Sequence, residues 1–205
     1  MPNWCYSSIK ICHNDKEALK EFVEKLKKWT SKPVCKTDFG NGWLGNIVAN
    51  SGIAKFEKRD DVYEFVPFVN CRGKIDNYEL KDNTLTIITD TAWCPMLQMW
   101  RMIIEKHLPE ADIWFTAEEP GNGIYETNDP DIVGCYNIDI FDPPEEFEDE
   151  EPVYIAEEDD VIDFLQRVLK TDESNIDNLL NLANDLEDRW FAINVWNDCD
   201  INYCD

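Results

Sequence analysis

Along the first 120 residues, the spacing of hydrophobic side chains alternates between the period of a strand and the period of a helix. Residues 4–13 alternate between apolar and polar positions, which is typical of a half-buried strand. A helical pattern follows, and strand-like runs at 74–80 and 84–90 then flank a short turn. A second helical pattern ends before Pro109, and residues 112–119 form another strand-like run. The predicted order is therefore β-α-β-β-α-β.

Both predicted helices carry end signals. Asn14 stands where an N-cap is expected, with Glu17 three residues later, and Pro95 occupies a first-turn position of the second helix. The apolar residues at helical spacing are Leu19, Phe22, Val23, Leu26 and Trp29 in the first helix and Met96, Leu97, Trp100, Ile103, Ile104 and Leu108 in the second. This order predicts an α+β fold, a ferredoxin-like antiparallel sheet with both helices on one face.

Residues 37–70 interrupt this order with an Asn/Gly-rich insertion. Its composition predicts a loop rather than a helix, packed in place by Trp43. Gly40, Gly42 and Gly45 suggest a phosphate cradle, but no clear strand precedes them and no acidic partner for a ribose stands out downstream. A packing loop is therefore the favoured interpretation of this insertion.

Negative charge is concentrated in the second half of the chain. Residues 1–110 contain 16 Lys/Arg and 15 Asp/Glu, whereas residues 111–205 contain 3 and 28. The net charge of −24 therefore comes from the second half. Such a surface repels nucleic acid and anionic lipid and attracts basic proteins or cations. Direct binding to nucleic acid or to a membrane is disfavoured.

The cysteines are predicted to be reduced and mostly buried in a cytosolic protein. The sequence has no secretory signal pattern and no run of about 18 apolar residues. It has no C-x-x-C pair, and His13 and His107 are its only histidines, so neither a structural zinc site nor a cofactor is expected. For Cys199 and Cys204 the sequence leaves two alternatives: they form a disulfide, or they contribute to a metal site. The eight cysteines are Cys5, Cys12, Cys35, Cys71, Cys94, Cys135, Cys199 and Cys204.

Residues 142–160 contain eleven carboxylates, three prolines and no basic residue. This composition is typical of a solvated, flexible segment. Helical spacing recurs at 161–169 and 176–186. The predicted organisation is a ferredoxin-like domain at 1–141, an acidic linker at 142–160, and an acidic helical hairpin with a tail at 161–205.

The sequence offers no group of residues that favours catalysis. Cys12 and His13 are neighbours on a predicted strand and point to opposite faces. Cys94 precedes a helix N-terminus, where a thiolate is favoured, but His107 lies too far along that helix to act as its base. Paired carboxylates are expected by coincidence in so acidic a chain. We therefore expect a non-enzymatic protein with no catalytic residues.

Three short stretches together resemble one protein family. They are Met1-Pro2-Asn3-Trp4-Cys5, Thr91-Ala92-Trp93-Cys94-Pro95 and Glu118-Glu119-Pro120-Gly121. Over about residues 1–140 the sequence resembles the Api-like proteins of phages, plasmids and genomic islands, which have a ferredoxin-like C-terminal domain and no established biochemical activity. The resemblance implies a mobile-element protein of the bacterial cytoplasm, and it implies no catalytic residues.

The acidic half and this resemblance together predict a function. We expect the protein to bind and inhibit a basic host protein, a nucleic-acid-handling defence effector, through a surface that imitates nucleic acid, with aromatic side chains as anchors. The predicted partner-binding residues are Glu145, Glu146, Glu148, Asp149, Glu150, Glu151, Glu157, Glu158, Asp159, Asp160, Asp188, Trp190 and Trp196. The alternative is a small-ligand or nucleotide-binding protein or enzyme that uses the Asn/Gly-rich loop and the sheet face. A homo-oligomer is a further alternative.

Overall fold

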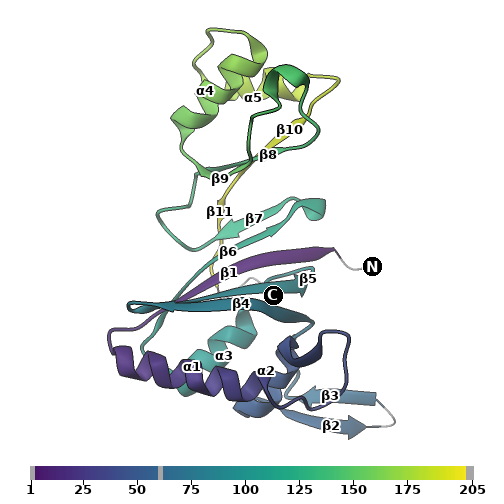
Figure 1. Ribbon diagram of the computed structural model, residues 1–205, viewed down its shortest axis with the longest axis vertical. Helices are drawn as coiled ribbons and strands as arrows, with labels where there is room; N and C mark the ends of the chain where they lie inside the picture. Colours follow the sequence, from purple (N-terminus) through teal and green to yellow (C-terminus); the bar gives the residue numbers. More distant parts are fainter. Residues whose placement is uncertain (1–2, 60–61, 202–205) are drawn as a thin grey trace. The chain divides into compact units, whose positions relative to one another are not determined.

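The computed structural model describes residues 3–59 and 62–201. It has a mixed α+β architecture with a six-stranded sheet and, within the described residues, five α-helices. The chain forms two compact units (Figure 1), one made of Met1–Asp129 with Cys199–Asp205 and the other of Pro130–Asp198. Each unit has its own hydrophobic core.

The six-stranded sheet contains all the strands that periodicity predicts in the β-α-β-β-α-β order. Its strand order is β11-β7-β6-β1-β5-β4. Strand β1 lies between β5 and β6 and is antiparallel to both, with Ser7 opposite Thr89 on one side and Ala117 on the other. The bounds are β1 (Trp4–Cys12), β4 (Gly73–Lys81), β5 (Thr84–Ala92), β6 (Asp112–Glu119), β7 (Ile124–Thr127) and β11 (Asn197–Asp198).

Helices α1 (Lys16–Thr30) and α3 (Leu97–His107) cover one face of this sheet (Figure 1). Their starts differ from the predicted ones. Asp15, not Asn14, is the N-cap of α1, because its Oδ1 accepts hydrogen bonds from two backbone N–H groups of the first turn. Met96 has a left-handed conformation and precedes α3. The shared core includes Ile9, Ile11, Leu19, Phe22, Leu26, Leu85, Ile87, Trp100 and Ile103.

The Asn/Gly-rich insertion contains helix α2 (Leu44–Ser51), so the predicted loop is wrong there. Asn46 is fully buried. Its Oδ1 accepts a hydrogen bond from Val34 N at 3.0 Å, and its Nδ2 donates to two carbonyl oxygens of the preceding turn. Asn50 Nδ2 donates to two carbonyl oxygens at the end of α1, at 2.9 and 2.7 Å. These tertiary hydrogen bonds override the weak helix propensity of asparagine.

A hairpin that periodicity did not predict follows α2. It consists of β2 (Lys55–Arg59) and β3 (Val62–Val66), which pair antiparallel. The ring of Trp43 packs against Phe56 and Phe65, with centroid distances of 6.1 and 6.0 Å. Trp43 therefore anchors the insertion, as the sequence predicts.

The second unit consists of a three-stranded sheet in the order β10-β8-β9, together with two helices. It begins at Pro130, so the predicted domain boundary after residue 141 is wrong. Its elements are β8 (Tyr136–Ile140), η3 (Glu145–Phe147), β9 (Val153–Ala156), α4 (Glu158–Leu169), α5 (Ile176–Asn184) and β10 (Phe191–Val195). Its core contains Ile138, Ala156, Val161, Phe164, Leu165, Leu179, Ala183 and Phe191.

Residues 142–160 are part of this second unit and not the flexible linker that their composition predicts. The ring of Phe147 stacks on Trp190 with a centroid distance of 5.1 Å. The carboxylate of Glu150 accepts hydrogen bonds from the guanidinium of Arg167. An aromatic contact and an ion pair thus hold the acidic segment against the rest of the unit.

Candidate functional site

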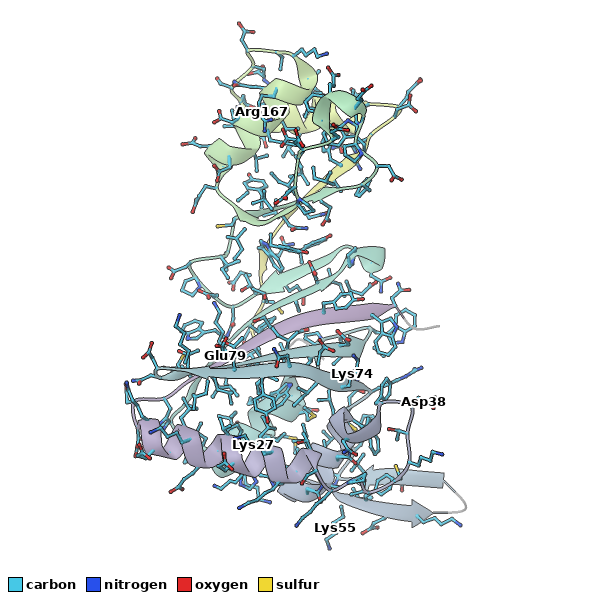
Figure 2. All side chains as sticks on the ribbon, viewed as in Figure 1. Lys27, Asp38, Lys55, Lys74, Glu79 and Arg167 are labelled. Atoms are coloured by element: carbon cyan, nitrogen blue, oxygen red, sulfur yellow. The ribbon has the colours of Figure 1, made fainter. Side chains whose placement is uncertain are left out.

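The second unit carries most of the protein's negative charge. Residues 130–198 contain 21 Asp/Glu and three Lys/Arg, which gives a net charge of −18. Two of the three basic residues form ion pairs inside the unit, Arg167 with Glu150 and Lys170 with Glu146. Side-chain oxygen atoms project outward from this unit (Figure 2). The negative charge therefore lies on a folded body.

An acidic hollow of about 430 Å³ lies on this unit. Its apolar lining comes from Ile138, Val153 and Phe164, and its polar lining comes from Glu150, Glu151, Asp160, Asp163 and Arg167. A lysine or arginine side chain has the matching chemistry, because its methylene stem packs on apolar groups while its charged head pairs with carboxylates. The hollow can therefore accept a basic side chain from a partner.

Arg167 shows how the hollow holds a guanidinium. Its two terminal nitrogens donate to the two carboxylate oxygens of Glu150. Its guanidinium carbon lies 5.9 Å from the centroid of the Phe164 ring, which adds a cation–π attraction. The hydrogen bond to Glu150 raises the pKa of Arg167 above its usual value. Carboxylate and aromatic groups thus act together on one cation.

Some predicted partner-binding carboxylates also serve the unit itself. Glu157 precedes α4, and its backbone N–H donates to Asp160 Oδ2 at 3.1 Å. The acidic residues in the first turn of α4 stabilise the helix, because they lie at the positive end of its dipole. Apart from the half-buried Glu150, the predicted carboxylates are all exposed on this unit: Glu145, Glu146, Glu148, Asp149, Glu151, Glu157, Glu158, Asp159, Asp160 and Asp188.

The two predicted aromatic anchors, Trp190 and Trp196, both have packing roles in the second unit. Trp190 contacts the rings of Phe147, Phe164 and Phe191 at centroid distances of 5.1, 6.0 and 5.3 Å. Trp196 is 4% exposed, and its Nε1 donates to the carbonyl oxygen of Tyr154 at 2.8 Å. Trp196 is therefore buried, whereas Trp190 is half-buried and its role as an anchor stays a prediction.

Strand β9 carries exposed apolar residues that are not among the predicted anchors. Strand β9 is an edge strand of its sheet, and Val153, Tyr154 and Ile155 on it are 40, 62 and 51% exposed. Apolar residues on an edge strand are a recurring feature of interaction surfaces. The available signal was a run of three apolar residues between two acidic blocks.

The three stretches that resemble Api-like proteins meet at one corner of the first unit. Trp93 N donates to the carbonyl oxygen of Asn3 at 3.1 Å. Thr91 Oγ1 donates to the carbonyl oxygens of Cys5 and Cys94 at 3.2 and 2.7 Å. A Cβ on Gly121 would lie 2.8 Å from Asn3 Nδ2. This corner fixes the start of β1 against the start of α3 and the end of β6.

His107 packs and hydrogen-bonds between elements of the first unit. His107 Nε2 lies 2.9 Å from the carbonyl oxygen of Ser51, and its ring centroid lies 4.8 Å from that of Trp29. Asn70 Nδ2 lies 3.8 Å from the Sγ of Cys94. His107 is therefore engaged at α2, away from any role as a base for Cys94.

Comparison with family models, curated proteins and solved structures found no match. Membership of the Api-like family therefore stays a prediction.

Among residues 3–59 and 62–201, no group of three or more His, Cys, Asp or Glu side chains is placed to hold a metal ion. Within the same residues, no helix has the length and apolarity needed to cross a membrane. Cys199 takes part in a disulfide, whereas Cys204 lies outside the described residues. Within the described residues, the cysteines outside a disulfide are Cys5, Cys12, Cys35, Cys71, Cys94 and Cys135.

Proposed function

We propose that the second unit binds a basic protein surface and thereby keeps nucleic acid from that surface. The placement of the acidic residues carries this proposal, since they lie on a folded unit with its own core. A folded array of carboxylates loses little conformational freedom on binding, so its attraction for a partner is not offset by the cost of ordering a flexible segment.

The class of partner follows from the charge. Duplex DNA carries about one negative charge per 1.7 Å of its axis, and a protein that holds it presents a matching array of Lys and Arg. A unit with 21 carboxylates and three basic residues complements such a protein. Tyr154 and Ile155, which follow Val153 of the hollow, would add apolar area that excludes water from the contact.

The biological setting is the second part of this proposal. The antiparallel order β6-β1-β5-β4, with α1 and α3 on one face, supports a ferredoxin-like topology for the first unit. Together with the resemblance to Api-like proteins, it supports a mobile-element protein that acts in the bacterial cytoplasm. There the protein would block a nucleic-acid-handling defence effector without any catalytic step.

Binding of a basic probe to charge-reversed variants of the full chain tests this function. The probe is a fluorescent peptide of six Arg-Ser repeats, and fluorescence anisotropy gives its Kd at 50 and 300 mM NaCl. The test variant is Glu148→Lys with Asp149→Lys in the second unit. The matched control is Asp38→Lys with Glu79→Lys, which reverses two exposed carboxylates of the first unit (both labelled in Figure 2) and changes the net charge equally.

We expect the second-unit variant to weaken binding at least about tenfold and the first-unit variant to weaken it less than about twofold. We also expect the wild-type affinity to fall steeply with salt, because ion pairing releases counterions. Equal losses in the two variants would mean that the peptide responds only to net charge, which would refute a recognition surface on the second unit.

A further inference from the structure

The insertion of the first unit contains two neighbouring cavities that the acidic-surface function does not use. Their volumes are about 440 and 380 Å³, and the larger lies within the usual range of small-molecule sites. Cys35 and Thr37 line both cavities. The two spaces therefore adjoin one another across these two residues.

The larger cavity has aromatic walls. Trp43, Phe56 and Phe65 line it, and the centroids of the two phenylalanine rings lie 5.0 Å apart. Phe68 also lines it and is 80% exposed, so its ring stands at the opening. Aromatic faces and edges arranged in this way favour a planar aromatic ligand over a compact aliphatic one.

Thr37, which lines both cavities, carries a buried hydroxyl. Its Oγ1 is buried, and the described residues provide no hydrogen-bond partner for it. A buried hydroxyl without a partner costs about 1–3 kcal/mol of folding free energy. This position therefore points to a ligand that brings a polar atom to the junction of the two cavities.

Among the described residues, the lining of the smaller cavity includes one basic residue and no acidic residue. Lys36, Gly40 and Asn41 contribute to its lining. Glu64 and Arg72, by contrast, line the larger cavity together. An anionic group on a ligand is therefore best accommodated in the smaller cavity, beside Lys36.

The two thiols of the larger cavity do not add negative charge at neutral pH. Burial raises the pKa of Cys71 to about 12 and also raises the pKa of Cys35. Protonated thiols behave as small apolar groups with weak donors. They neither repel an anion nor act as nucleophiles, so binding in these cavities would be reversible.

We propose that these two cavities form one binding site for a planar aromatic molecule that carries an anionic group. The ring packs against the cavity wall formed by Trp43, Phe56 and Phe65, a polar atom reaches Thr37 Oγ1, and the anionic group reaches Lys36. The proposal concerns the first unit alone and does not depend on how the second unit functions.

Two matched probes test the site on the full chain. Indole-3-acetate has the ring and the charge, whereas indole-3-acetamide has the same shape without the charge. Isothermal titration calorimetry measures both affinities. The test variants are Lys36→Gln and Thr37→Val, and the control is Tyr154→Ala, which removes an exposed ring of the second unit. Thermal unfolding of each variant verifies that it folds.

We expect indole-3-acetate to bind with a sub-millimolar Kd, at least about fivefold more tightly than the amide. Lys36→Gln should abolish this difference, Thr37→Val should weaken both probes by about threefold or more, and Tyr154→Ala should change neither. The proposal is overturned if indole-3-acetate does not bind at 10 mM, if the two probes bind equally to the wild type, or if folded Lys36→Gln and Thr37→Val proteins bind like the wild type.

Discussion

The guanidinium of Arg167 binds both carboxylate oxygens of Glu150, 17 residues earlier in the chain. Arg167 lies on α4, and Glu150 lies in the acidic segment between η3 and β9. The Glu150 side chain is 23% exposed and that of Arg167 is 54% exposed. This pair therefore links the acidic segment to a helix of the second unit and helps to keep its carboxylates in fixed positions.

Loss of this ion pair should loosen the acidic segment. We predict that Arg167→Gln lowers the stability of the second unit by about 0.5 kcal/mol, a small effect because the pair is partly solvated. Digestion by a glutamate-specific protease should become faster at residues 145–151. The control is Lys27→Gln, which removes an exposed i,i+3 pair with Glu24 on α1. Equal digestion rates in wild type and Arg167→Gln would contradict the role of this pair.

A core substitution should unfold the second unit selectively. Phe191 is fully buried, and its ring centroid lies 5.2 Å from that of Phe164. We predict that Phe191→Ala costs about 3–5 kcal/mol through lost contacts and a cavity. Hydrogen exchange should then lose protection in residues 136–195 and keep it in β1 and β5. The control is Leu182→Ala, at a side chain that is 47% exposed. Simultaneous loss of protection in both units would argue against separate cores.

Gly45 should resist a substitution that normally stabilises a helix. Gly→Ala in a helix interior is usually favourable by about 1 kcal/mol. At Gly45, however, a Cβ would clash with the ring of Trp43. We therefore predict that Gly45→Ala destabilises the first unit by about 1–3 kcal/mol and shifts the emission of Trp43. Urea unfolding measures whether the free energy of unfolding falls or rises. A stabilised variant would show that Trp43 does not pack over α2.

Two buried thiols should make stability depend on alkaline pH. Burial raises the pKa of Cys5 to about 11 and that of Cys71 to about 12, from 9.0. Above pH 9 the unfolded chain loses these protons while the folded chain keeps them. Below pH 9 these two thiols should therefore cause no change in the free energy of unfolding. Between pH 9 and 11 they should lower it, by up to about 1.4 kcal/mol per thiol per pH unit.

Urea unfolding at several pH values measures this slope, and Cys5→Ala should reduce it. Iodoacetamide at pH 8 should label Cys5 and Cys71 slowly in the folded protein and rapidly in urea. Rapid labelling of both residues in the folded state would contradict their burial.

Hydrophobic periodicity was sufficient to predict the strands and helices that have long apolar patterns. The pattern of residues 4–13 matches β1, and the helical spacing from Leu19 to Trp29 matches α1. It failed in the insertion, because Asn46 and Asn50 form tertiary hydrogen bonds that no local pattern reveals. It also missed β9, a four-residue strand inside an acidic run.

The sequence predicted the exposed carboxylates of the candidate surface. It did not predict which apolar side chains are exposed there. Acidic residues are exposed almost regardless of the fold, so their type alone placed them on the surface. Whether a tryptophan faces inward depends on its neighbours. Trp190 faces Phe147 and Phe164, whereas the ring of Tyr154 is exposed.

Mapping of the Arg-Ser peptide by amide chemical-shift perturbation tests the central claim most directly. With the full ¹⁵N-labelled chain at 50 mM NaCl, the account predicts saturable shifts concentrated at Glu150, Glu151, Asp160 and Asp163 around the hollow and along β9. Perturbations of similar size spread over the exposed carboxylates of both units, including Asp38 and Glu79, would contradict it.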